Sequence, residues 1–122
     1  MAIFIAAWYK EHPEHDVGLH LALTSEWKHY RWGPVAPRSE VPGLIDAEGY
    51  LPRSVAEVAL KSNGAEVEKE IRAQVERALS RGIRPGHLDT HMGTLYARLD
   101  FTRAYLKVAE EYKIPAMAIE LI

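Results

Sequence analysis

His87-Leu-Asp-Thr-His91 is the stretch that decides the fold, because its alternating polar and apolar residues predict a β-strand. Successive side chains of a strand point to opposite faces, so both histidines and Asp89 share one face. Imidazole and carboxylate groups are ligands of divalent metals, and burying three of them unpaired is costly. The alternative is an edge strand whose polar face is open to solvent. Parallel strands of α/β folds are usually covered on both faces, which argues against this alternative without removing it.

The stretch Asp16-Val-Gly-Leu-His-Leu-Ala-Leu-Thr24 predicts a second strand. Its larger apolar residues share one face, and His20 shares the other face with Gly18 and Ala22, which leave space around the imidazole. A single histidine on a strand is more often a hydrogen-bonded structural residue than a ligand. If the two strands are neighbours, however, His20 and the polar residues of the first stretch converge. The pattern then indicates a candidate hydrolytic metal centre.

Composition restricts the class of protein and its partners. The chain has 122 residues, of which 48% are hydrophobic and 26% charged, values typical of one soluble globular domain. Its net charge of −2 offers no basic surface for nucleic acid or an anionic membrane. The apolar residues 2–8 are far fewer than the roughly 20 that span a bilayer. Because cysteine is absent, a metal site must use His, Asp or Glu, and we expect a cytoplasmic location.

Helix and strand signals alternate along the rest of the chain. The apolar residues 2–8 predict a buried helix that ends before Pro13, and the clearest helix lies between a cap at Asn63 and a stop at Gly82. Further elements are a helix over residues 54–61, a helix from Asp100 onward and a last strand over residues 116–122. This alternation predicts an α/β fold with parallel strands, in a sheet or barrel, within the single domain 1–122.

Two motifs in order, Gly18-Leu-His-Leu21 and His87-Leu-Asp-Thr-His91, resemble the YdjC-like carbohydrate deacetylases. Residues 27–34, 41–46 and 82–96 extend the resemblance, which covers about residues 8–115. It implies a partial (β/α) barrel of the polysaccharide-deacetylase-like type. It also implies a metal-dependent enzyme that hydrolyses the N-acetyl groups of amino sugars such as chitooligosaccharides.

The resemblance also implies a metal site built from one aspartate and two histidines. The two histidines correspond to His20 and His91, whereas His87 and Asp89 become neighbours of the ligands. Asp89 is in addition a candidate for proton transfer. The cofactor implied is Mg²⁺, although two imidazoles also suit Zn²⁺. Nothing before His20 resembles the family's Asp-Asp motif, so we expect a part of a larger barrel that is truncated at both ends.

Residues 25–53 predict a long irregular loop, and loops of this length often bind ligands. The resemblance makes its Trp27, Tyr30, Trp32 and Arg38 candidates for sugar binding, because aromatic faces stack on sugar rings. Packing of the same aromatic residues against the rim of the barrel is an equal alternative.

Two functions therefore stay open from the sequence. The first is a carbohydrate deacetylase acting on an acetylated amino sugar or oligosaccharide, without nucleic-acid or membrane partners. The second is a non-catalytic fragment or degenerate copy that binds metal or sugar. Such a chain could also assemble with another chain that supplies the missing strand. A homo-oligomer is a separate expectation, because a partial barrel leaves strand edges unpaired.

Overall fold

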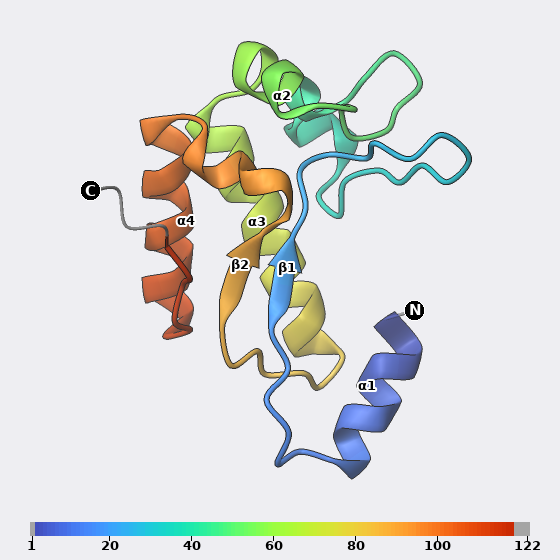
Figure 1. The fold of residues 1–122 in the computed structure, drawn as a ribbon, viewed down its shortest axis with the longest axis vertical. Helices are drawn as coiled ribbons and strands as arrows, with labels where there is room; N and C mark the ends of the chain where they lie inside the picture. Colours follow the sequence, from blue (N-terminus) through green and yellow to red (C-terminus); the bar gives the residue numbers. More distant parts are fainter. Residues whose placement is uncertain (1, 119–122) are drawn as a thin grey trace.

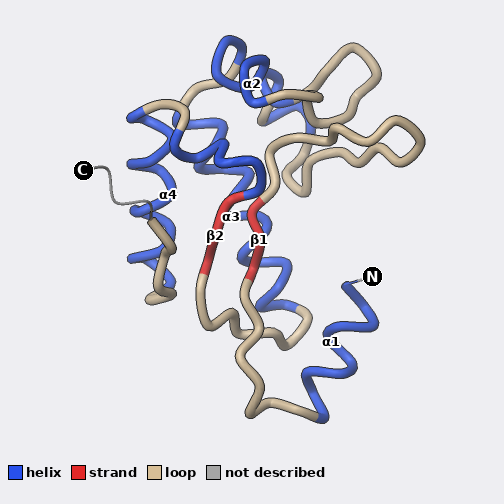
Figure 2. The backbone as a smooth tube through the Cα atoms, in the orientation of Figure 1, coloured by secondary structure: helices blue, strands red, loops and turns tan. Residues whose placement is uncertain are grey.

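Two short parallel strands lie at the centre of the computed structural model, which describes residues 2–118. They are β1 (Leu19–Leu21) and β2 (Leu88–Thr90), and the chain between them contains α2 (Val55–Lys61) and α3 (Gly64–Ser80) (Figures 1 and 2). The register pairs His20 with Asp89. The predicted parallel pairing is therefore confirmed, although both regular strands are shorter than predicted.

The α3 helix begins and ends where the sequence predicts. The Asn63 side-chain oxygen accepts a hydrogen bond from the backbone N–H of Glu66 at 3.0 Å, which satisfies one free donor of the first turn. Beyond the last turn, Gly82 has a φ of +82°, a conformation that favours glycine. The stripe between these ends packs into the core through the fully buried side chains of Val67, Ile71 and Val75.

The α4 helix (Leu99–Tyr112) packs against α3 and is hydrogen-bonded to the backbone of β2. The single O–H of its buried Tyr105 is shared between the backbone oxygens of Leu88 and Met117, which lie 2.9 and 2.8 Å from the hydroxyl oxygen. The predicted last strand is reduced to a single parallel bridge between Ala116 and Leu88, and its residues 119–122 lie outside the described residues. One strand pair and one bridge do not define a closed barrel, so the barrel type stays a prediction.

The helices cover only one face of the strand pair. Leu21 and Leu88 point into the core and are fully buried, while the His20 side chain on the opposite face is 56% exposed. The expectation that both faces are covered is therefore wrong for this pair within residues 2–118. The polar face of the strands is open, as the edge-strand alternative proposed.

The first helix, α1 (Ala2–Glu11), ends before Pro13 as predicted and lies apart from the other helices (Figure 1). Its side chains are described for residues 7–11, and these are mostly exposed, with Trp8 stacked on His12 at a ring-centroid distance of 4.5 Å. The prediction of a buried helix is thus wrong for this part of α1. Across residues 2–118, no helix combines the length and the apolar character required to cross a bilayer.

The long segment 25–53 is irregular, as predicted, apart from the short 3₁₀ helices η1 (Arg38–Glu40) and η2 (Pro42–Leu44). Glu70, a fully buried residue of α3, fixes the middle of this segment. Its carboxylate accepts hydrogen bonds from the backbone N–H groups of Val35 and Ala36 at 3.0 and 2.8 Å. Burial raises the pKa of Glu70, although these hydrogen bonds oppose the rise. The contact places the loop beside the carboxyl end of β1.

Candidate functional site

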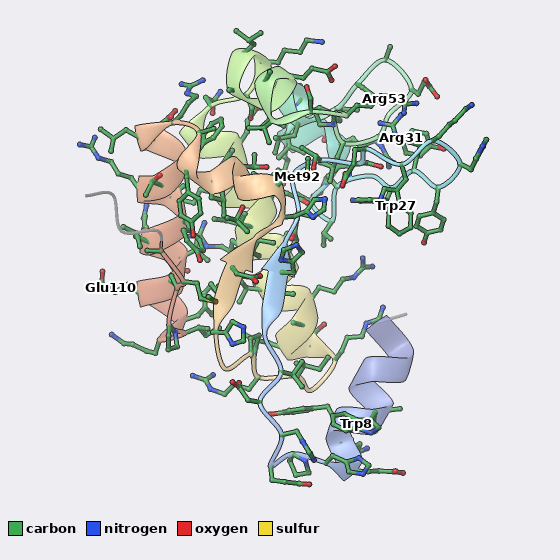
Figure 3. The ribbon with its side chains drawn as sticks, viewed as in Figure 1. Trp8, Trp27, Arg31, Arg53, Met92 and Glu110 are labelled. Carbon is green, nitrogen blue, oxygen red and sulfur yellow. The ribbon has the colours of Figure 1, made fainter. Side chains whose placement is uncertain are left out.

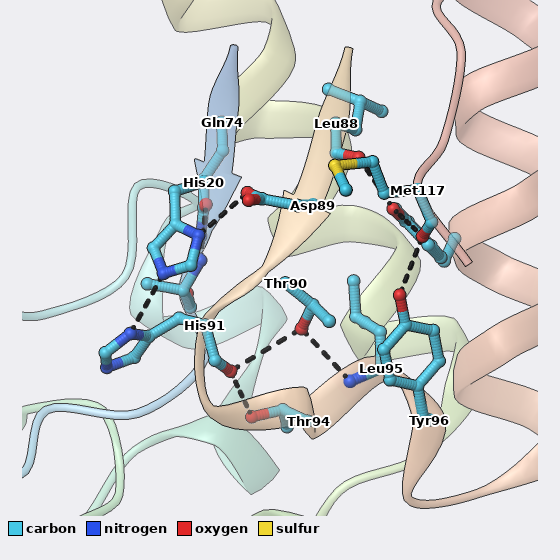
Figure 4. A network of polar contacts seen from close by, with 12 residues as sticks. His20, Gln74, Leu88, Asp89, Thr90, His91, Thr94, Leu95, Tyr96 and Met117 are labelled. Atoms are coloured by element: carbon cyan, nitrogen blue, oxygen red, sulfur yellow. Dashed lines mark hydrogen bonds and ion pairs between the residues drawn. The ribbon is translucent and has the colours of Figure 1, made fainter. Parts of the chain in front are cut away.

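His20 and Asp89 form the centre of a polar cluster at the carboxyl ends of the two strands. The parallel register places them side by side, and His20 Nδ1 lies 2.7 Å from Asp89 Oδ1 (Figure 4). An ionised carboxylate can only accept, so Nδ1 carries the hydrogen and His20 Nε2 is unprotonated in the neutral ring. That Nε2 atom faces His91 Nδ1 at 3.1 Å, with the two rings inclined at 79°. The predicted convergence of both histidines and Asp89 is therefore present.

A tight turn after β2 directs His91 back toward β1. His91 is the first residue of η3 (His91–Tyr96), and Met92 and Gly93 both adopt left-handed conformations with φ of 61° and 67°. The Thr94 hydroxyl donates to the His91 carbonyl oxygen at 3.0 Å, which closes the turn (Figure 4). A non-glycine residue such as Met92 in this region is strained by about 1 kcal/mol or more. The surrounding hydrogen bonds maintain that conformation beside the candidate site.

Glu26 is the member of the cluster that sequence reasoning missed. Its Oε1 atom contacts His91 Nε2, and its Oε2 atom accepts from the Thr24 hydroxyl at 3.4 Å. Burial acts to raise the pKa of Glu26, but hydrogen bonds from its own backbone and from His91 outweigh it and hold the pKa below its usual range. One signal could have found it: a carboxylate that closely follows the carboxyl end of a strand lies at the edge where ligands gather in α/β folds.

His87 shares the polar face but lies outside these contacts. Its Nδ1 atom is 3.8 Å from Asp16 Oδ2, and its ring occupies the space above Gly18, where a Cβ would overlap it. The cluster thus runs from Asp89 through His20 and His91 to Glu26. We call these four residues the histidine cluster.

In the histidine cluster, one nitrogen of His20 and one of His91 lie at hydrogen-bond distance from each other. Within residues 2–118, no group of three or more His, Cys, Asp or Glu side chains has the arrangement to hold a metal ion. Asp89 and Glu26 instead contact the outer nitrogens of the two rings, as carboxylates beside metal-binding histidines do. Metal binding by His20 and His91 therefore stays a prediction.

The loop brings three of the four predicted sugar-binding residues together. The rings of Trp27, Tyr30 and Trp32 lie 6.0–6.3 Å apart, and Trp27 and Tyr30 are 61% and 65% exposed. Trp27 projects from the loop away from the helices (Figure 3). Trp32 instead packs partly against the core, as the packing alternative expects. Arg38 lies outside this group and donates to the Gly49 carbonyl oxygen at 2.7 Å.

Arg31 fixes the loop that carries these aromatic residues. Its side chain is only 7% exposed, pairs with Asp46 at 2.8 Å and donates to Ser25 Oγ at 3.2 Å and to the Leu51 carbonyl at 2.8 Å. The guanidinium also lies over the ring of Tyr50, at 5.2 Å. Its Nη1 atom is buried and has no hydrogen-bond partner within the described part of the chain. We call Arg31, Asp46 and Ser25 the arginine cluster.

Comparison with known proteins now identifies the family. The profile of the YdjC-like proteins matches residues 3–122. The chain belongs to the YdjC-like protein family. The predicted resemblance is therefore confirmed over nearly the whole chain.

Two relatives of this YdjC-like chain carry the name carbohydrate deacetylase. The protein from Thermus thermophilus is 37% identical over 114 residues, which cover 93% of this chain and 41% of the relative. The protein from Brevibacillus brevis is 36% identical over 106 residues, which cover 87% and 39%. The chain thus spans about two fifths of the length of the relatives that it matches.

A solved structure supports the same relationship. A crystal structure of a protein from Enterococcus faecalis, described as a candidate cellobiose-phosphate cleavage protein, matches with a TM-score of 0.80 and 28% identity. The match covers 93% of this chain and 42% of that chain. The arrangement of helices and strands in this chain is therefore shared with part of a larger protein.

Proposed function

We propose that this chain provides the two-histidine part of a metal-dependent carbohydrate deacetylase centre, which hydrolyses N-acetyl groups of amino sugars. The observation that carries the proposal is the approach of His20 Nε2 to His91 Nδ1, 3.1 Å apart at the carboxyl ends of two parallel strands. Membership of the YdjC-like family supports it, and so do the relatives named carbohydrate deacetylase.

The two nitrogens suit a divalent metal. Two imidazoles that share one tetrahedral Zn²⁺, at bond lengths of about 2.0–2.1 Å, have nitrogens about 3.3 Å apart. The observed separation of 3.1 Å is close to that value. Zn²⁺ is the ion favoured by imidazole, whereas Mg²⁺, which the family resemblance implies, prefers oxygen ligands. Both ions are therefore worth testing.

In the proposed reaction, His20 and His91 hold the metal and Asp89 orients His20. A metal bound there would lower the pKa of a water molecule and polarise the acetyl carbonyl. Asp89 is also our candidate for proton transfer, since its carboxylate lies at the same edge of the strands. Because no third donor joins the two nitrogens within residues 2–118, we propose that the implied aspartate ligand and the general base belong to the part of the relatives that this chain does not match.

The aromatic loop provides the proposed sugar contact. Trp27 and Tyr30 expose their rings, and an exposed aromatic face can stack on the apolar face of a sugar. Arg31 fixes the base of the loop next to the carboxyl end of β1, the strand that carries His20. This arrangement allows one bound oligosaccharide to meet both the loop and the histidine cluster.

A second candidate function follows from the incomplete donor set. A chain with two metal ligands and an exposed aromatic surface can bind metal or sugar without catalysing hydrolysis. This alternative predicts measurable binding of zinc or of chitotriose, but no release of acetate.

Calorimetric titration of Zn²⁺ and Mg²⁺ into the 122-residue protein tests the proposal. We expect one metal per chain, with affinity reduced at least about tenfold in His20→Ala and in His91→Ala because each removes one of two ligands. His29→Ala, at an exposed histidine of the loop, is the matched control. Unchanged affinity in both ligand variants would overturn the proposed site. Acetate release from chitotriose by the metal-loaded protein would then exclude the non-catalytic alternative.

A further inference from the structure

We infer that Glu26 is a positioning residue that holds His91 in the tautomer with hydrogen on Nε2, so that the Nδ1 lone pair faces His20. The inference deepens the proposed function and rests on it, because this lone pair is the one offered to the metal. It concerns an interaction that lies outside the predicted set of ligands and neighbours.

The contact between Glu26 and His91 fixes which ring nitrogen carries the hydrogen. The carboxylate can only accept, so His91 Nε2, which it contacts, must donate. A neutral imidazole has one N–H, and His91 Nδ1 is therefore left with its lone pair. Both side chains of this pair are 23% exposed, compared with 56% for His20. Lower exposure to water strengthens the hydrogen bond that selects the tautomer.

Glu26 and Asp89 select opposite tautomers on the two rings. Asp89 holds the hydrogen of His20 on Nδ1, and Glu26 holds that of His91 on Nε2. The remaining lone pairs then face each other across 3.1 Å, an arrangement that is repulsive until a cation lies between them. The two carboxylates thus leave each ring with one unprotonated nitrogen, and both of these nitrogens are available to the same cation.

Without the Glu26 carboxylate, the hydrogen of His91 would no longer be held on Nε2. His91 would be free to move its hydrogen to Nδ1 and to donate it to His20 Nε2, which lies at hydrogen-bond distance. The two rings would then satisfy each other, and a metal would first have to break their hydrogen bond. We therefore expect weaker metal binding without any change in the ligands themselves.

The position of Glu26 depends on contacts that do not involve His91. The neighbouring Ser25 is fully buried, and its backbone N–H donates to the Pro52 carbonyl oxygen at 2.7 Å. The Thr24 hydroxyl donates to the second oxygen of Glu26. The backbone just before Glu26 is thus fixed by Ser25, and substitution of Glu26 removes the carboxylate from a backbone held by other contacts.

Nitrogen NMR of the metal-free, ¹⁵N-labelled 122-residue protein at pH 8 tests the inference directly, because long-range ¹H–¹⁵N spectra distinguish the two imidazole tautomers. In the unsubstituted protein we expect the Nε2–H form of His91 and the Nδ1–H form of His20. In Glu26→Ala, His91 should change to the Nδ1–H form, while Asp89 still holds His20. Glu26→Gln keeps an accepting oxygen and should retain part of the Nε2–H form.

Zinc affinity measured on the same samples provides the second readout. We expect a loss of about tenfold in Glu26→Ala and a smaller loss in Glu26→Gln, the size typical of contacts that orient metal-binding histidines. Asp89→Ala is the matched comparison, because it removes the acceptor that holds the hydrogen of His20 on Nδ1 and leaves the contact of His91 with Glu26. Glu40→Gln, at an exposed carboxylate of the loop, controls for the change in charge.

The outcomes separate this inference from the proposed function. An Nδ1–H form of His91 in the unsubstituted protein, or an unchanged tautomer in both Glu26 variants, would overturn the positioning role even if zinc binds. The predicted tautomers without zinc binding would instead sustain the role of Glu26 and count against the metal site. If Glu26→Ala fails to fold, as judged by amide dispersion, Glu26→Gln decides alone by the same two readouts.

Discussion

The histidine cluster and the arginine cluster include the adjacent residues Glu26 and Ser25, which follow β1, and they use their polar groups in opposite ways. In the arginine cluster, opposite charges meet: Arg31 pairs with Asp46, and its side chain is 7% exposed. In the histidine cluster, like groups meet: two ring nitrogens face each other, and the His20 ring is 56% exposed. The arginine cluster satisfies most of its own hydrogen bonds, whereas the histidine cluster holds two ring nitrogens 3.1 Å apart beside an exposed imidazole.

This difference indicates which polar groups stabilise the fold and which are available to a ligand. Removing one partner from a buried ion pair leaves an uncompensated charge, so the arginine cluster should control stability. Substituting an exposed side chain usually changes stability by no more than about 0.5 kcal/mol, so the exposed His20 of the histidine cluster should affect binding and not stability. The predictions below test whether stability and binding separate in this way.

Asp46→Ala should give the largest effect on stability. It leaves the buried Arg31 guanidinium without its carboxylate and also removes the acceptor for the backbone N–H groups of Glu48 and Tyr50. We expect a loss of about 3 kcal/mol in the free energy of unfolding, measured by urea titration at pH 7. His20→Ala in the same assay should stay within about 0.5 kcal/mol of the unsubstituted protein. Equal losses in the two variants would show that the clusters do not differ as proposed.

The Asp46 carboxyl group also gives the stability a pH dependence of known sign. Burial acts to raise the pKa of Asp46, but hydrogen bonds from Arg31 and from the backbone outweigh it, and the pKa falls below 3.8. A carboxyl group with a lowered folded-state pKa stabilises the fold above its unfolded-state pKa, and loses this contribution as the pH falls through the folded-state value. The stability difference between the unsubstituted protein and Asp46→Asn should therefore be constant above about pH 5 and shrink below pH 3.8. A difference that grows on acidification would contradict this assignment.

Trp27→Ala separates the exposed tip of the loop from its buried anchor. The variant removes a ring that is 61% exposed and leaves the arginine cluster intact, so unfolding should be unaffected. Binding of chitotriose to the zinc-loaded protein should weaken by about 1 kcal/mol, the scale of one aromatic contact. Calorimetry measures the affinity, and Trp8→Ala, at the exposed tryptophan of α1, is the matched control. Equal affinity in both variants would favour a packing role for Trp27.

Much of the candidate site could be predicted because strand alternation is a local property. The alternation around His20 and the His87 to His91 motif predicted two strands, and their parallel register brought His20, Asp89 and His91 together. Glu26 could not be found in the same way. Its contact with His91 depends on the left-handed turn at Met92 and on an irregular segment after β1, and neither has a periodic signal.

The burial of elements was predicted less well than their positions along the chain. The apolar composition of residues 2–8 predicted a helix correctly, but not the exposure of Trp8. Periodicity shows which side chains could be buried, while burial itself depends on which other elements pack there. For the same reason, the covered second face expected for β1 and β2 is absent within residues 2–118.

His87→Ala should have the smallest effect, and it tests the limit of the histidine cluster. Alternation alone groups His87 with Asp89 and His91, but the structure places its ring over Gly18, with Asp16 as its nearest carboxylate at 3.8 Å. We therefore expect zinc affinity to change by less than about twofold, because no member of the cluster loses a hydrogen bond. Asp89→Ala, which removes the acceptor of His20 Nδ1–H, provides the positive control in the same titration. A tenfold loss in His87→Ala would mean that the whole polar face of the strand acts as one unit, and that the boundary drawn between His87 and Asp89 is wrong.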